Sequence, residues 1–358
     1  MPRPLLSLII ILQFMHLGLQ QSDAASRSQD PYTSYFTGNS TDKEVQPDFG
    51  ITMMGGRTEH DVAMQWFLGK ANGGDVLVLR ASGSNGYNDY LYTKLGVKVN
   101  SVESLVIKTA EAANHPYVIE KIEKAEAIWM AGGDQFNYVS IWGNSKMKDA
   151  LNKHINKKRG VIGGTSAGMA VLGEWYFSAE NGTIQSEEAL RNPYHEKAKL
   201  GNDFLRIELL KNTIADTHYA DRKRQGRHSA FISRIAKEQE KRTFGIACDE
   251  YTAICIGADG IAHTFGKSPE KENAIYFIQT TCKGSMLPEQ CKPGSPLSWM
   301  ANKSAMSVYK IIANSSGQQT FNLNTWENGS GGEWFDWYID NGNWIETPGQ
   351  QPNCNHKK

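Results

Sequence analysis

The sequence of residues 160–170 is GVIGGTSAGMA, and this stretch decides the fold class. A β-prone apolar run enters the pattern Gly-x-Ser-x-Gly, and a run suited to a helix leaves it. A sharp turn of this kind between a strand and a helix is typical of a nucleophile elbow, which would project the hydroxyl of Ser166. Backbone N–H groups at the start of the helix, including that of Ala167, can receive an oxyanion. The alternative is a glycine-rich turn that carries no chemistry.

The segments around this turn predict a sheet that is mostly parallel. Apolar runs at 49–54, 75–79 and 127–131 alternate with segments suited to helices, such as 61–70 and 146–157. Short strands that alternate with helices indicate βαβ units, so we expect an α/β fold with a doubly wound sheet covered on both faces. Between residues 244 and 312 several further strand-like runs predict a β-rich C-terminal half.

Several glycine-containing turns follow directly after predicted strands. They lie at residues 55–56, 82–84, 132–135 and 164–166. In sheets of this kind, ligands bind beyond the carboxyl ends of the strands. We therefore expect these turns to converge on one site.

The N-terminus has the pattern of a secretory signal peptide. Arg3 precedes an apolar run at 5–12, and small residues follow at 24–26. This predicts a signal peptide over residues 1–25 and a secreted, extracellular protein. The alternative is a membrane anchor, but the run is short for a bilayer span. Residues 26–47 are polar, and we expect a flexible lead-in there.

Secretion changes the meaning of other short patterns. Asn-x-Ser/Thr sequons are possible glycan sites in a eukaryotic secretory pathway, and they lie at Asn39, Asn181, Asn302, Asn314 and Asn328. The chain has 5 cysteines, an odd number, so at least one is free or pairs between chains. Cys282 and Cys291 bracket a loop that a disulfide could close. Cys248 and Cys255 could pair or could be small buried residues.

Charge and ligand patterns exclude several classes of partner. Lys plus Arg and Asp plus Glu both number 38, so the formal net charge is zero. The chain therefore has no global attraction for nucleic acid or for an anionic membrane. No Cys/His spacing suggests a zinc site, and we expect neither a metal nor an organic cofactor.

A serine nucleophile needs a base and an orienting acid. Of the downstream histidines, His218 follows a predicted strand and would face the same edge as Ser166. His195 and His228 lie in polar stretches and are expected to be exposed, and His263 is expected to be structural. The acid is Asp249 or Glu250, and the pattern does not choose between them.

Four of these motifs together resemble the cyanophycinase family of serine peptidases. They are GGDQ at 132–135, GTSAG at 164–168, DTHY at 216–219 and DEYTA at 249–253, in the family's order. The resemblance covers residues 48–313, which we expect to form the catalytic domain. Residues 314–358 are then a C-terminal extension rich in Trp, Gly and Asn, either a tail packed on the domain or an appended module.

The resemblance implies a fold like that of class I glutamine amidotransferases, which is flavodoxin-like, with serine in place of cysteine. It implies that Ser166 is the nucleophile, His218 the base and Glu250 the orienting acid. For the oxyanion hole we expect the backbone N–H groups of Ala167 and of Gly133 or its neighbour Gly132. The substrate-binding residues that it implies are Asp134, Gln135, Asp216, Thr217, Arg222, Arg224 and Arg227. A homodimer is also implied.

The resemblance further implies an aspartate-rich peptide or isopeptide substrate. Family members cleave cyanophycin, a poly-aspartate chain that carries arginine on its side-chain carboxyl groups, to β-aspartyl-arginine. This sequence departs from the family at Thr217, where a glutamine is expected, and at Met169, where a small residue is usual. The alternatives are an aspartyl dipeptidase with the same site, and an inactive binding or lectin-like protein that uses its tryptophan-rich end.

Overall fold

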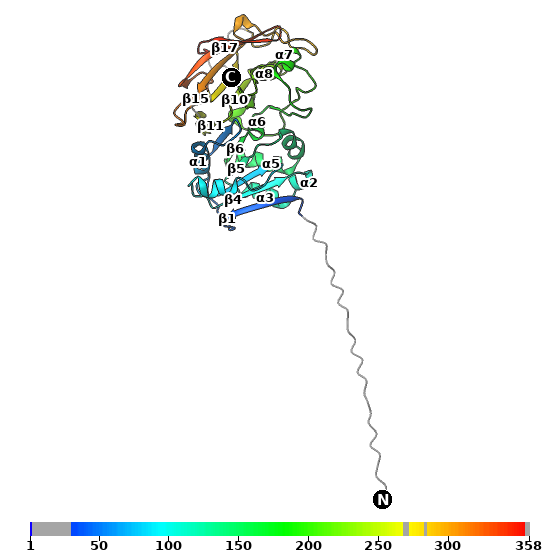
Figure 1. The fold of residues 1–358 in the computed structure, drawn as a ribbon, viewed down its shortest axis with the longest axis vertical. Helices are drawn as coiled ribbons and strands as arrows, with labels where there is room; N and C mark the ends of the chain where they lie inside the picture. Colours follow the sequence, from blue (N-terminus) through cyan, green and yellow to red (C-terminus); the bar gives the residue numbers. More distant parts are fainter. Residues whose placement is uncertain (2–29, 268–271, 283–284, 355–358) are drawn as a thin grey trace. The chain divides into compact units, whose positions relative to one another are not determined.

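Within the residues that the structure describes (1, 30–267, 272–282 and 285–354), five parallel strands form the centre of a ten-stranded sheet. The chain is represented by a computed structural model (Figure 1). The parallel strands lie in the order β4 (Ser101–Ile107), β3 (Asp75–Arg80), β5 (Ala127–Met130), β6 (Val161–Thr165) and β2 (Gly50–Met54). The expected α/β fold with a parallel centre is confirmed, and its closer assignment to a flavodoxin-like class stays a prediction.

Helices cover both faces of this parallel centre. In β3 the even-numbered valines pack in one buried cluster with α1 (Asp61–Lys70). The odd-numbered leucines of β3 pack on the opposite face, with α3 (Pro116–Lys124) and α5 (Lys146–Lys153). Because side chains alternate along a strand, an all-apolar strand supplies both layers at once.

Antiparallel strands extend the large sheet on both sides. On one side β1 (Tyr32–Gly38) pairs with β4, which corrects the expected flexible lead-in over 26–47. Its Tyr and Thr residues favour a strand, and Tyr32 stacks on Tyr117 with ring centroids 5.0 Å apart. On the other side of the sheet lie β11 (Thr252–Gly257), β12 (Ile261–Gly266), β15 (Thr320–Asn322) and β16 (Gly329–Ser330).

A second, six-stranded sheet carries most of the C-terminal half. Its order is β18 (Asn343–Pro348), β17 (Gly332–Asp340), β14 (Met306–Ile312), β13 (Ala274–Thr280), β10 (Phe244–Cys248) and β9 (Thr213–Thr217). Only β9 and β10 are parallel to each other among these described strands. Helix α8 (Gln225–Gln239) packs against both of them (Figure 1). The β-rich second half is therefore present.

The remaining described elements are short. A two-stranded sheet joins β7 (Tyr176–Phe177) to β8 (Leu200–Gly201). The short α-helices are α2 (Ala110–Ala113), α4 (Gln135–Asn137), α6 (Ala167–Ala170) and α7 (Ser186–Arg191). Single π- or 3₁₀-helical turns span Tyr90–Lys94, Tyr138–Trp142, His154–Lys158, Glu208–Leu210 and Ala301–Lys303.

The described part of the C-terminal extension, residues 314–354, is built into both sheets. Strands β15 and β16 join the large sheet, and β17 and β18 join the second sheet. Trp326 and Trp337 are buried, and Trp334 and Trp344 are half-buried. Of the two possibilities that the sequence left open, the packed tail is the one found.

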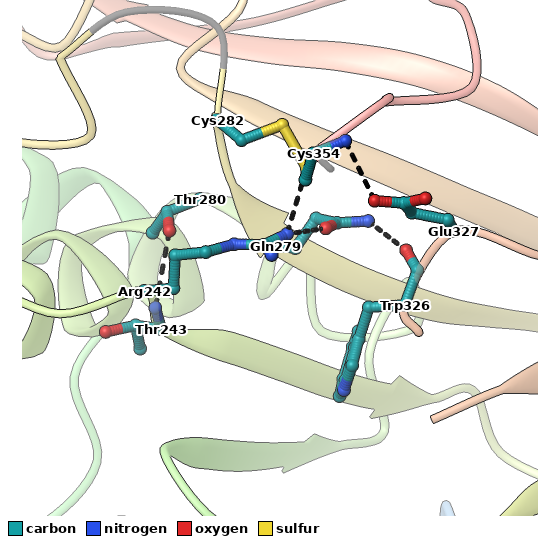
Figure 2. Close-up of a disulfide and its surroundings, with 8 residues drawn as sticks. All are labelled: Arg242, Thr243, Gln279, Thr280, Cys282, Trp326, Glu327 and Cys354. Carbon is teal, nitrogen blue, oxygen red and sulfur yellow. Dashed lines mark hydrogen bonds between the residues drawn. A yellow bond between two sulfur atoms is a disulfide. The ribbon is translucent and has the colours of Figure 1, made fainter. Parts of the chain in front are cut away.

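A disulfide joins Cys282, just after β13, to Cys354 near the end of the described chain (Figure 2). Cys248, Cys255 and Cys291 are free and buried, so the suggested pairing of Cys282 with Cys291 is wrong. Of the two alternatives for Cys248 and Cys255, the structure has small buried residues and not a pair. Cys248 and Cys255 lie on different strands, β10 and β11. The C-terminal end of the described chain returns to β13 and places Cys354 beside Cys282. The backbone N–H of Cys354 also donates to Glu327 at 2.8 Å.

Residues 2–25 of the expected signal peptide lie outside the described residues, as do residues 26–29. In the part of the chain that is described, no helix combines the length and apolar character that crossing a bilayer requires.

We predict that the disulfide between Cys282 and Cys354 stabilises the fold, because it links residues 72 positions apart and restricts the unfolded chain. Cys282→Ser and Cys354→Ser should each lower the free energy of unfolding by about 2–4 kcal/mol. The double variant should lose no more than either single variant, because both remove the same link. Urea unfolding measures this, and additive losses would contradict the pairing.

Candidate active site

Ser166 occupies the turn between β6 and α6. Its backbone has φ 52° and ψ −114°, a conformation that costs free energy for a residue with a side chain. The close packing beneath it explains the glycine two residues later, since a Cβ on Gly168 would lie 2.1 Å from the carbonyl oxygen of Met130 in β5. The turn therefore has the geometry of the nucleophile elbow predicted from the sequence.

The side chain of His218 meets the Ser166 hydroxyl. His218 follows β9 directly, and its Nε2 lies 2.8 Å from Ser166 Oγ. The helix α6 that begins after Ser166 packs against β9. Ser166 follows a strand of the large sheet and His218 follows a strand of the second sheet. The contact between α6 and β9 therefore brings the two side chains within hydrogen-bond distance.

Glu250 completes a chain of three side chains. It lies between β10 and β11, is 4% exposed, and places Oε1 at 2.8 Å from His218 Nδ1. Asp249, which the sequence left as the other possible acid, turns away from His218. Its carboxylate accepts hydrogen bonds from the backbone N–H groups of Ala220 (2.8 Å) and Ala274 (3.0 Å). Glu250 is thus the acid that faces His218, whereas Asp249 bonds to the backbone of two other segments.

Burial and charge shift the titration of these groups. Burial lowers the pKa of His218, and Glu250 only partly opposes this by hydrogen bonding to the imidazole. Burial alone would raise the pKa of Glu250, but the hydrogen bonds from His218 and Arg57 outweigh it and the pKa is lowered. Burial raises the pKa of Asp249 to about 6. At neutral pH these shifts favour a neutral imidazole beside a charged carboxylate.

A small cavity of about 70 Å³ opens beside Ser166. Ala167 and Gly133, the two residues expected in an oxyanion hole, both line it. Gly133 belongs to the turn after β5, and Ala167 is the first residue of α6. Two turns that the sequence predicted to converge at the strand ends therefore do so.

A larger cavity of about 390 Å³ shares part of its lining with the small one. Every expected site residue except Glu250 lines one cavity or the other, and Glu250 lies behind His218. The residues expected to bind substrate are distributed over both cavities: Asp134, Gln135, Asp216, Thr217, Arg222, Arg224 and Arg227.

The three arginines differ in what their charges face. Arg227 is 3% exposed, and it donates to both carboxylate oxygens of Asp216 at 2.8 and 2.6 Å. Arg224 donates to Asp216 at 3.2 Å and to the carbonyl of Thr217 at 2.7 Å. Burial alone would raise the pKa of Asp216, but the two guanidinium groups hold it well below its usual range. Asp216 is thus an ion-pair partner of Arg224 and Arg227. Arg222 is exposed and lines both cavities.

Some expectations from the sequence fail at this site, and two residues were missed. His228 was expected to be exposed, but it is fully buried and bonded to Tyr219 (3.1 Å) and the carbonyl of Ile214 (3.1 Å). Phe177 lines both cavities, and Arg57 contacts Glu250. The sequence offered a signal for Arg57, because it follows the glycine turn at 55–56 at the end of a strand.

Comparison with known proteins places the chain among the peptidases. Residues 57–264 match the model of peptidase family S51, a range that includes Ser166, His218 and Glu250. Since this range is more than half of the chain, the chain belongs to peptidase family S51. The expectation of a cyanophycinase-like family is confirmed.

Individual relatives are more distant. The chain is 26% identical over 181 residues to a cyanophycinase of Synechococcus elongatus, which is 51% of each protein. It is 26% identical over 177 residues to a cyanophycinase of Trichormus variabilis, which is 49% of this chain and 54% of the relative. The match therefore spans about half the length of these curated relatives. A crystal structure of a peptidase from an acI-B1 Actinobacterium aligns with TM-score 0.47 and 14% identity, covering 64% of this chain and 91% of that one.

The contrast between the two neighbouring acids gives a prediction. Glu250→Gln should lower the rate of any reaction at Ser166 by about 10³–10⁴-fold, because a neutral amide does not stabilise the imidazolium and its NH₂ group can donate to Nδ1, which favours the wrong tautomer of His218. Asp249→Asn should mainly lower stability, because it weakens two backbone hydrogen bonds, and the folded protein should keep its rate within about tenfold. Reaction with a fluorophosphonate probe and thermal unfolding separate the two effects. The reverse pattern would assign the acid to Asp249.

Proposed function

We propose that this chain is a serine-type peptidase that hydrolyses aspartyl peptide or isopeptide bonds through an acyl-enzyme. The observation that carries the proposal is the unbroken chain from Ser166 Oγ to His218 to Glu250, with both hydrogen bonds at 2.8 Å. Membership of peptidase family S51 supports the same reaction class.

The geometry supports a specific order of steps. His218 Nε2 takes the proton of the Ser166 hydroxyl while Oγ attacks the carbonyl carbon, and Glu250 stabilises the imidazolium that forms. The backbone N–H groups of Ala167 and Gly133 stabilise the oxyanion. His218 then gives the proton to the leaving amine, and a water molecule, activated by the same histidine, releases the acid product.

The charge balance of the cavities supports an acidic substrate. Arg222, Arg224 and Arg227 together carry three positive charges, and Asp216 neutralises one of them. Asp134, at the larger cavity, offsets a second positive charge. The cavities keep a net positive charge, which the carboxylates of a substrate would neutralise. The curated relatives are cyanophycinases, so we propose cyanophycin or a related aspartyl peptide as the substrate.

The residues that differ from the family bear on the choice between substrates. Thr217 lines the small cavity next to the base, where its side chain is shorter than the expected glutamine. Met169 is fully buried and packs in the core rather than in the cavity. Thr217 is therefore the position where the specificity would shift towards an aspartyl dipeptidase.

We also propose that the protein is secreted. The N-terminal pattern of Arg3, an apolar run and small residues supports this. All five sequon asparagines are exposed among the described residues. The disulfide between Cys282 and Cys354 fits an oxidising compartment.

An inactive lectin-like role has less support. Sugar-binding tryptophans present their faces to solvent. The four tryptophans between residues 314 and 354 are buried or half-buried.

The proposed mechanism predicts the acid limb of the pH profile. His218 must be neutral to accept the serine proton, and burial lowers its pKa below the usual value of about 6.5. As the pH falls, activity should therefore persist to below pH of about 6.5 before it declines. The dependence of kcat/KM on pH measures this, and an acid limb with its midpoint above the usual histidine pKa would contradict it.

The decisive experiment compares the wild type with Ser166→Ala on cyanophycin and on β-aspartyl and α-aspartyl dipeptides, with products identified by mass spectrometry. We expect the wild type to release β-aspartyl-arginine and Ser166→Ala to lose at least about 10⁴-fold of this activity. Ser140→Ala is the matched control, because the Ser140 hydroxyl is exposed and bonds only to the carbonyl of Phe136 among the contacts described.

Cleavage of dipeptides alone would assign the dipeptidase alternative to the same site. If the wild type cleaves nothing and Ser166 does not react with a fluorophosphonate, the peptidase proposal fails.

A further inference from the structure

Three consecutive carbonyl groups of residues 54–56 hold the three segments that carry the Ser-His-Glu chain. They accept hydrogen bonds from the backbone N–H groups of Ser166 (3.0 Å), His218 (2.9 Å) and Tyr251 (3.1 Å). Tyr251 directly follows Glu250. The end of β2 and its turn are therefore bonded to all three segments that carry the Ser-His-Glu chain.

The backbone of this segment also supports the imidazole ring directly. Gly56 has φ +117°, and a Cβ at this position would lie 2.3 Å from Cε1 of His218. Only a glycine allows the imidazole ring so close to the main chain. His218 therefore packs its ring against Gly56 and also donates its backbone N–H to the carbonyl of Gly55.

The next residue along the segment, Arg57, reaches the acid. Its Nε lies 3.1 Å from Glu250 Oε2, while the other carboxylate oxygen, Oε1, faces His218. The Arg57 side chain is 62% exposed, whereas that of Glu250 is 5% exposed. The exposed guanidinium of Arg57 is thus paired with Oε2, the carboxylate oxygen of Glu250 that does not bond to His218.

We propose that Arg57 is a positioning residue, which holds Glu250 Oε2 so that Oε1 stays directed at Nδ1 of His218. This role rests on the function proposed above. With both oxygens engaged, the carboxylate cannot rotate about its terminal bond without losing a charged hydrogen bond. Arg57 also balances part of the negative charge that faces the imidazole.

Other charged groups face the same pair. Arg222 and Arg224 act on His218 from the segment after β9. Asp221 of that segment accepts a hydrogen bond from the backbone N–H of Glu250 at 3.2 Å. Arg57 takes no part in these contacts. The added effect of the loss of Arg57 is therefore the removal of one positive charge beside the Glu250 carboxylate, which favours the imidazolium.

The test uses Arg57→Gln, Arg57→Lys and the control Arg159→Gln, with the rate of fluorophosphonate labelling as the measurement. Arg159 is also exposed and also has a positive φ (59°, against 68° for Arg57), but it lies before β6, at the opposite end of that strand from Ser166. We expect Arg57→Gln to label about three- to tenfold more slowly than the wild type. Arg57→Lys should recover part of the rate, and Arg159→Gln should label as the wild type does.

Combining Arg57→Gln with Glu250→Gln tests whether Arg57 acts through the acid. In the Glu250→Gln background, replacing Arg57 should have no further effect. Histidine ring NMR adds a measurement that needs no reaction, and Arg57→Gln should move the titration of His218 to higher pH.

The outcomes are separable. A wild-type rate with an unshifted or lowered His218 titration in Arg57→Gln overturns the inference, and so does an equal loss of rate in both backgrounds. If no protein is labelled but the titration still rises in Arg57→Gln and not in Arg159→Gln, the function proposed above fails while the positioning by Arg57 stands.

Discussion

The hydrogen bonds accepted by residues 54–56 are the constraint on which the site depends. Ser166 follows a strand of the large sheet, His218 follows a strand of the second sheet, and Glu250 lies on the connection between the two sheets. Each backbone hydrogen bond contributes only about 1 kcal/mol to stability. These hydrogen bonds matter more for the positions of the three segments than for stability, because the carbonyls that accept them belong to consecutive residues and hold the segments close together. The three side chains thereby inherit their spacing from the main chain of β2 and its turn.

A buried ion pair sets the character of the adjoining cavity. Burying Asp216 beside Arg227 is costly for each charge alone, and it is tolerated because both carboxylate oxygens are bonded. The pair holds the guanidinium of Arg227 at the cavity wall in one orientation. Arg224 bonds to the same carboxylate and to the chain next to the histidine. One network in this way joins the cavity wall to the segment that carries His218.

The sequence predicted the parallel centre and the nucleophile elbow because both depend on local pattern: apolar runs of strand length and glycines at a fixed spacing. It failed where the outcome depends on distant contacts. Residues 32–38 are polar enough to suggest a flexible segment, and they become a strand because the edge of β4 is available. His228 is in a polar stretch, and it is buried because two acceptable partners lie beside it. The choice of Glu250 over Asp249 depends on which of two adjacent side chains the turn directs at His218. A shift of one residue in this turn would exchange the two, and the local pattern does not fix it.

The division of residues 314–354 between the two sheets has a consequence for the family as a whole. The family match ends at residue 264, inside β12, so β13 to β18 all lie beyond the matched residues. Strands β15 to β18 cover the outer edges of β12 and β14, which would otherwise present rows of unpaired backbone groups to other chains. A member of the family that keeps β12 and β14 but lacks residues 314–354 must protect those two edges in another way, by oligomer contacts, a covering helix or charged side chains. Variation at the C-terminus of these peptidases is thus expected to change how they associate before it changes what they cleave.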